Sequence, residues 1–120
     1  MFCYTQTGLN CWKTSVACVL EIPPSELPEQ ICPSYDIILN KWLYKKGLQF
    51  VRYPYFPKMN LYGMPRYCFL SGKSVRSVGE YSNRTHMIVG YDGKPIWDPH
   101  PTRIGLATIT DISFIMPLVS

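Results

Sequence analysis

Residues 86–99 read HMIVGYDGKPIWDP and contain two apolar runs joined by Asp92-Gly93. Two such runs around an Asp-Gly pair are typical of a β-hairpin, because these residues readily adopt the backbone angles of a tight turn. The sequence therefore predicts two antiparallel strands here. His86 opens the first strand, and Asp98 closes the second.

The length of the turn decides which side chains face each other across this hairpin. A two-residue loop, which the Asp-Gly pair alone slightly favours, pairs His86 with Pro99 and turns Asp98 to the other face. A three-residue loop pairs Gly90 with Lys94 and places His86 directly opposite Asp98, with Cβ atoms roughly 5 Å apart. A site built on His86 and Asp98 requires the longer loop, which we therefore expect.

Helices are expected upstream of the hairpin. Asn10 is a good N-cap for a helix over 11–21, and apolar residues at helical spacing continue this pattern over 34–46, before a glycine suited to the C-cap position. The proline-broken stretch 22–33 has room for one helical turn around 25–30.

Strands are expected over 48–53, 66–72 and, as one or two segments, 107–119, whereas the polar stretch 73–85 is expected to be a loop. Helices followed by strands predict an α+β domain, in which N-terminal helices pack on a small antiparallel sheet. We expect one domain over 1–120.

Composition excludes several classes of protein. No basic start followed by an apolar run marks a signal peptide, and no apolar run approaches the ~18 residues that cross a bilayer, so we expect no membrane association. Five irregularly spaced cysteines do not resemble a disulfide framework, which favours a reducing, cytoplasmic setting.

The net charge of +4 is mild, and no Lys/Arg run exceeds two residues, so we expect no nucleic-acid partner. Bases and aromatic residues mix only in the segment 52–67. We expect this segment to be a surface loop that packs its tyrosines on the core, rather than a base-stacking platform.

Cys11 stands where a polar loop becomes a helix. The unpaired N–H groups and the dipole of a first helical turn favour an anion, and so favour the nucleophilic thiolate. The same N–H groups can bind the oxyanion of a tetrahedral intermediate. With His86 as base and acid and Asp98 orienting the imidazole, Cys11 would be a nucleophile, and the Gln6 amide could donate to the oxyanion.

The same residues have structural alternatives. Cys11 could be a core cysteine, and His86 a core histidine bonded to the backbone. His100, between two prolines, is expected to be a rigid loop residue rather than a base. A zinc site from Cys11, His86 and Asp98 lacks the C-x-x-C or H-x-x-x-H spacing of such sites, so we expect neither metal nor cofactor. The other cysteines are expected to be core or surface thiols: Cys3, Cys18, Cys32 and Cys68.

The helix-starting cysteine in NCW, the upstream Gln6, the strand histidine and the aspartate of the second strand together resemble the papain-like cysteine peptidase superfamily. The string HMIVGYDGKPIWDPHP is most similar to the compact branch that processes bacteriocin leader peptides inside ABC exporters, in which a GYD turn follows the histidine and an Asp-Pro closes the hairpin. Small uncharacterised phage and bacterial proteins with an NC…AC start and a DPHP end are also similar. The resemblance covers 6–22 and 86–103.

Two features depart from the superfamily pattern. Gln6 lies five residues before Cys11, where six is usual, and the residues after the cysteine are WKT rather than small ones. Lys13 could support the thiolate or select an acidic group, but a solvated helix face is the expectation we favour.

The resemblance implies a papain-like fold and a thiol-dependent hydrolase that attacks an amide or isopeptide carbonyl with a Cys11–His86–Asp98 triad. Its substrate would be a protein or peptide, met as an extended tail or an exposed side chain, and a phage enzyme acting on a host or virion protein would suit the small size. Two alternatives stay open: a deamidase or cell-wall amidase with the same triad, and a non-enzymatic binding or inhibitor module that uses 52–67 as its interface.

Overall fold

Two α-helices precede all the strands in the computed structural model, which describes residues 1–30, 35–75 and 85–118. Helix α1 (Cys11–Leu20) begins at the predicted residue and ends where Glu21 takes the left-handed conformation, with φ at 58°. A short 3₁₀ turn, η1 (Pro24–Glu26), leads towards α2 (Tyr35–Tyr44). Both predicted helices are confirmed, although the expected start of the second, at Ser34, lies outside the described residues. No described helix has the length and apolar character to cross a membrane.

In the described part of the chain, five strands form one antiparallel sheet in the order β1-β5-β2-β3-β4. The strands are β1 (Leu48–Pro54), β2 (Tyr67–Ser74), β3 (Thr85–Tyr91), β4 (Lys94–Trp97) and β5 (Leu106–Pro117). The last is a single strand of twelve residues, which pairs with β2 along its first part and with β1 along its second. The predicted α+β class with an antiparallel sheet is therefore confirmed.

The expected loop over 73–85 is wrong at both of its ends. Strand β2 continues through Ser74, and β3 already begins at Thr85. Between them, residues 76–84 lie outside the described part of the chain.

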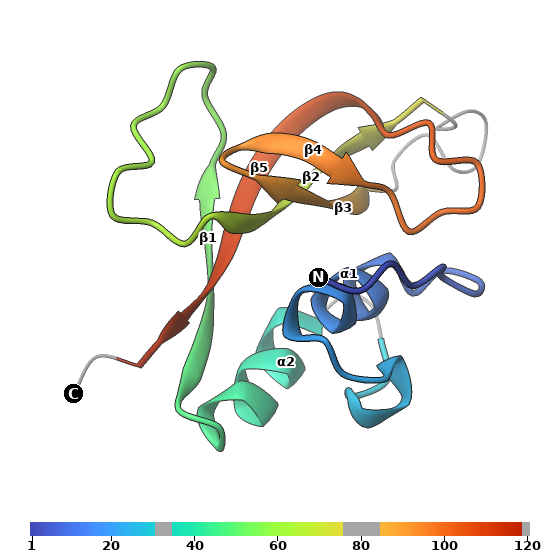
Figure 1. Cartoon of the computed structure of the whole chain (residues 1–120), viewed down its shortest axis with the longest axis vertical. Helices are drawn as coiled ribbons and strands as arrows, with labels where there is room; N and C mark the ends of the chain where they lie inside the picture. The colour runs from blue at the N-terminus through green and yellow to red at the C-terminus, as the bar shows by residue number, and fades with distance from the viewer. Residues whose placement is uncertain (31–34, 76–84, 119–120) are drawn as a thin grey trace.

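Apolar side chains on successive residues of β2 and β3 enter two different clusters. Phe69 and Met87 pack with the helices, whereas Leu70 and Ile88 enter a second cluster on the opposite face. Figure 1 shows why one cluster belongs to the helices, since α1 and α2 lie together on one side of the sheet. Burial on both faces explains why these strands read as continuous apolar runs rather than as alternating ones.

The segment between β1 and β2 covers the second cluster. Tyr55, Met59, Leu61 and Met64 pack against it, whereas the Tyr62 side chain is 95% exposed. The expectation of a loop packed on the core by its tyrosines is therefore correct for Tyr55 and wrong for Tyr62. Methionine and leucine supply most of the contact.

The β3–β4 turn has two residues, so the three-residue loop that we expected is wrong. Tyr91 pairs with Lys94 and Gly90 with Pro95, not Gly90 with Lys94. Asp92 and Gly93 have φ angles of 52° and 80°, as a tight hairpin turn with two left-handed residues requires. The local preference of the Asp-Gly pair decides the turn.

A β-bulge follows this turn and shifts the register of the strand residues beyond it. Val89 pairs with Trp97 although Gly90 pairs with Pro95, so β4 contains one extra residue at this point. Proline has no N–H to continue the ladder, which favours such an irregularity beside it. The paired residues of β4 end at Trp97, and Asp98 follows directly, where its carboxylate bonds to the His86 imidazole.

Gly72 provides a test of how closely the sheet packs beside the start of β3, because it pairs with His86 in the ladder. A Cβ at this residue would lie 1.9 Å from the carbonyl oxygen of Thr108, a backbone atom that cannot rotate away. We expect Gly72→Ala to lower the free energy of unfolding by about 3 kcal/mol in urea denaturation, the upper end of overpacking costs.

Gly63→Ala is the matched control for this substitution. The Cβ that this substitution adds meets no atom within 4 Å. The expected loss of stability is therefore only the cost of a positive φ of 81°, roughly 1 kcal/mol. Equal losses for the two variants would contradict the close approach of β5 to Gly72.

Candidate functional site

Helix α1 is fixed against β3 next to the histidine. Cys11 is the first residue of α1 and is 6% exposed. One turn further, the buried hydroxyl of Ser15 donates to the Met87 carbonyl oxygen over 3.3 Å. Because Met87 follows His86 directly, this bond anchors the helix at the strand position from which the imidazole projects.

The first turn of α1 is capped by a residue that the sequence did not indicate. Asn10 stands at the N-cap position, but its side-chain oxygen accepts the N–H of Thr7 and caps no helix N–H. Instead, Oε1 of Gln30 accepts the N–H groups of Trp12 and Lys13, over 3.0 and 3.2 Å. The cap therefore comes from the segment after η1, eighteen residues along the chain.

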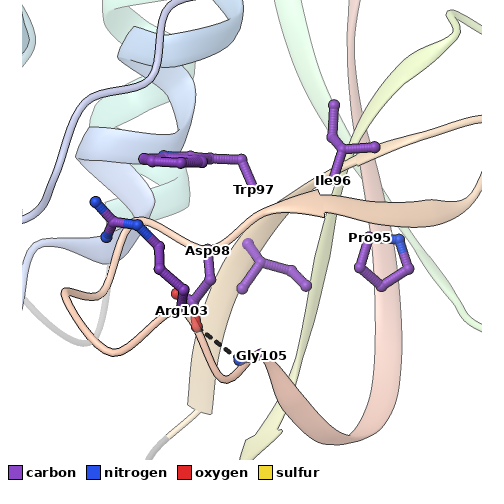
Figure 2. Close-up of a pocket in the computed structure, with 7 residues that line it drawn as sticks. Pro95, Ile96, Trp97, Asp98, Arg103 and Gly105 are labelled. Atoms are coloured by element: carbon purple, nitrogen blue, oxygen red, sulfur yellow. Dashed lines mark hydrogen bonds between the residues drawn. The ribbon is translucent and has the colours of Figure 1, made fainter.

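The structure brings His86 and Asp98 together. His86 Nε2 donates to Asp98 Oδ1 over 2.6 Å, and both side chains are buried. The backbone N–H groups of His100 and Gly105 donate to the two carboxylate oxygens over 2.9 and 2.8 Å. Figure 2 shows the bond to Gly105, which closes the loop after β4 around the carboxylate.

These three donors set the charge of the carboxyl group. Burial by itself would raise the pKa of Asp98, but the hydrogen bonds from His86, His100 and Gly105 outweigh it and lower the pKa from 3.8 to about 2. Asp98 is therefore ionised at neutral pH in spite of its burial.

The imidazole is held between two partners. Burial by itself would lower the pKa of His86, but hydrogen bonds with Asp98 and with the Cys11 side chain, and the charges of both, raise the pKa from 6.5 to about 9. Since Nε2 is engaged by Asp98, Nδ1 is the nitrogen left for the sulfur. His86 thus connects a carboxylate to a thiol, the arrangement that activates a thiol nucleophile.

Gln6, the predicted oxyanion donor, is buried beside this loop. Its backbone N–H donates to the Pro99 carbonyl oxygen over 2.8 Å, which ties the upstream segment to the residue after Asp98. Its side-chain Nε2 donates to the Gly8 carbonyl over 2.9 Å, and its Oε1 has no partner among the described residues. One N–H of the amide is thus engaged, and the second is the one available to a ligand.

Arg103 and Trp97 hold the N-terminal segment and the loop after β4 together. The indole N–H of Trp97 donates to the Tyr4 carbonyl over 2.9 Å, and the Arg103 guanidinium donates to Thr5 Oγ1 over 2.6 Å. The guanidinium also lies 4.1 Å from the centre of the Trp97 ring, a cation–π contact that Figure 2 shows. No local sequence pattern predicts these two hydrogen bonds, because their partners are more than ninety residues apart.

A cavity of about 280 Å³ lies next to Trp97 and Arg103, as Figure 2 shows. Asp98 is part of its wall, but neither Cys11 nor His86 lines it. The cavity is therefore behind the carboxylate, away from the sulfur. Its lining residues are Ile88, Pro95, Ile96, Trp97, Asp98, Arg103 and Gly105.

Lys13 does not have the surroundings that its sequence context suggested. The lysine is 6% exposed, and its Nζ binds Oε1 of Glu29 over 3.0 Å, so the expected solvated helix face is wrong.

The His100 ring accepts the Thr102 N–H over 3.1 Å and contacts the His86 ring edge-on, with centroids 6.3 Å apart. Within 1–30, 35–75 and 85–118, no three His, Cys, Asp or Glu side chains form a group that could hold a metal ion.

The charged pair predicts how stability depends on pH. His86 has a raised pKa in the folded chain, so its contribution is complete below pH 6.5 and is lost as the pH rises through about 9. Asp98 has a lowered pKa, so its contribution is complete above pH 3.8 and is lost as the pH falls towards 2. The difference in Tm between the wild type and Asp98→Asn should therefore be largest between pH 4 and 6.5 and should shrink towards pH 9 and above.

Thermal unfolding at pH 5, 7 and 10 measures this difference. Asp92→Asn is the control, because that carboxylate pairs with Arg66 at the surface and should change Tm little at any pH. A loss for Asp98→Asn that is the same at pH 5 and pH 10 would show that the two side chains do not form a charged pair.

No protein-family model matches the chain, and neither a curated protein nor a solved structure matches it. The fold and the geometry of the site are thus established by the structure itself, and a function has to be argued from the chemistry of Cys11, His86 and Asp98.

Proposed function

We propose that the chain is a thiol-dependent hydrolase of the papain-like kind, in which Cys11 is the nucleophile, His86 the acid and base, and Asp98 the group that orients the imidazole. The observation that carries this proposal is the position of His86, which is hydrogen-bonded to a buried carboxylate and lies close enough to the thiol at the start of α1 for that thiol to contribute to the raised pKa of the imidazole.

The electrostatics support the same assignment. With its pKa raised to about 9, His86 is an imidazolium at neutral pH, and a cation next to sulfur favours the thiolate. The helix N-terminus acts in the same direction. Asp98 stays ionised and fixes the ring through Nε2, which leaves Nδ1 to exchange a proton with the substrate.

The reaction would proceed in two steps. The Cys11 thiolate attacks the carbonyl carbon of an amide, and the resulting oxyanion is stabilised by N–H donors at the helix start and by the Gln6 amide. The C–N bond then breaks as His86 protonates the leaving nitrogen, which gives a thioester. Water, deprotonated by His86, attacks the thioester carbonyl, and the C–S bond breaks to release the carboxylic acid and restore the thiol.

The substrate that we propose is a protein or peptide presented as an extended tail or an exposed side chain. The cavity near the site lies behind Asp98 and is not lined by Cys11. The proposed substrate is therefore bound along the surface at Cys11 rather than inside this cavity.

Selective alkylation tests the nucleophile. At pH 6 ordinary thiols are almost fully protonated, so iodoacetamide should label Cys11 at least tenfold faster than the other cysteines, as measured by peptide mass spectrometry. Cys3 is the control, because it is exposed whereas Cys11 is buried, and accessibility alone would reverse the order. His86→Ala should remove the preference for Cys11. Uniform labelling, or Cys3 first, would contradict nucleophilic catalysis.

Comparing the proteome and peptidoglycan of cells that express the wild type or Cys11→Ala identifies the substrate. On that substrate, Gln6→Ala should lower turnover roughly 10²-fold if its amide binds the oxyanion, with folding unchanged. Gln49→Ala serves as the matched control, since Gln49 lies on β1 and its side chain bonds only the Pro117 carbonyl among the described residues. An unchanged rate for Gln6→Ala would mean that backbone donors act without Gln6.

A protein-binding role is the second candidate, and the loop between β1 and β2 favours it. Phe56 and Tyr62 are 63% and 95% exposed, so both aromatic side chains are accessible to a partner. Reactivity separates the two functions, because a binding module has no reason to make one cysteine react faster than the rest.

A further inference from the structure

Residues 27–30 lie along the first turn of α1 and present two adjacent polar side chains to it. Glu29 Oε1 binds the Lys13 ammonium over 3.0 Å, and Gln30 Oε1 accepts the N–H groups of Trp12 and Lys13. Two nearly isosteric side chains thus have different targets. The charged one meets a cation, and the neutral one meets the helix end that carries Cys11.

The two N–H groups bound by Gln30 belong to the set that a helix start leaves without internal partners. Thr14 donates to the Asn10 carbonyl, and Cys11's own N–H has no partner among the described residues. The cap therefore takes the donors of Trp12 and Lys13 and leaves that of Cys11, beside the sulfur, for an oxyanion.

A carboxylate at this place would be the stronger cap. It would accept the same two N–H groups with charge-assisted bonds and would interact favourably with the helix dipole. It would also put a negative charge next to the sulfur and oppose both a thiolate and an oxyanion. A cap that served stability alone would gain from glutamate, whereas a cap beside a nucleophile is best neutral.

We propose that Gln30 is a positioning residue for Cys11, which fixes the first turn of α1 through a neutral oxygen and leaves the positive end of the helix to the thiolate and the oxyanion. This inference rests on the proposed thiol chemistry and adds to it a residue that the sequence pattern of the triad does not contain.

Three variants separate charge from structure. Gln30→Glu adds a carboxylate at the cap, Glu29→Gln removes one from its neighbour, and the double variant exchanges the two residues at constant net charge. The rate of Cys11 alkylation by iodoacetamide is measured from pH 5 to 9, with thermal unfolding of each variant. Cys3, which is exposed, reports the intrinsic reaction in every sample.

Gln30→Glu and the double variant should keep or raise Tm but slow Cys11 alkylation about tenfold at pH 6, with the rate profile displaced to higher pH, as expected for like charges nearby. Glu29→Gln should react within about twofold of the wild type. Gln30→Met, which has a similar shape but no acceptor oxygen, should lower Tm and slow Cys11 at least threefold, so a test remains if Gln30→Glu does not fold.

A Gln30→Glu rate within twofold of the wild type at every pH, or a Gln30→Met rate equal to it, would overturn the inference and make Gln30 a simple cap. A wild-type Cys11 that reacts no faster than Cys3 would instead overturn the proposed thiol chemistry. The two failures are therefore distinguishable in the same experiment.

Discussion

The hydrogen bond between His86 and Asp98 is the interaction on which the rest of the site depends. A buried carboxylate is costly unless its oxygens are bonded and a counter-charge lies nearby. Here the imidazole, at 2.6 Å, and the N–H groups of His100 and Gly105 meet that requirement. The loop after β4 is shaped by it, because two of the three donors come from that loop. A lone buried histidine would have needed none of this.

Several segments must be in place before this pair and the thiol can meet. Helix α1 is anchored to β3 by Ser15, its first turn is capped by Gln30, and the N-terminal residues are fastened to the loop after β4 by Trp97 and Arg103. Most of these contacts join residues far apart in the chain, so the site exists only in the complete fold. This dependence explains why single local motifs identify the residues but not their geometry.

The sequence predicts the elements well where the signal is local. The hairpin at Asp92-Gly93 and the antiparallel sheet follow from turn chemistry and apolar runs, and α1 starts at Cys11 as predicted although the Asn10 side chain does not cap it. The expected register is wrong because the Asp-Gly pair takes the two-residue turn that its local preference favours, and because a bulge beside Pro95 then shifts β4 by one residue. The roles of Gln30 and the burial of Lys13 were not predictable, since each depends on a partner brought by tertiary folding.

The bulge in β4 has a consequence for how such hairpins diverge. In an antiparallel ladder, adding or removing a single residue exchanges inward and outward side chains for everything beyond it. The position from which Asp98 reaches His86 therefore depends on the number of residues in β4 and on the bulge, as well as on the identity of the two residues. A relative with one further residue between Gly93 and Asp98 and no second bulge would keep the hairpin and both residues, but its aspartate would follow β4 in a register shifted by one residue, on the other face. In this architecture length variation in a four-residue strand can abolish chemistry that residue-by-residue comparison would report as intact.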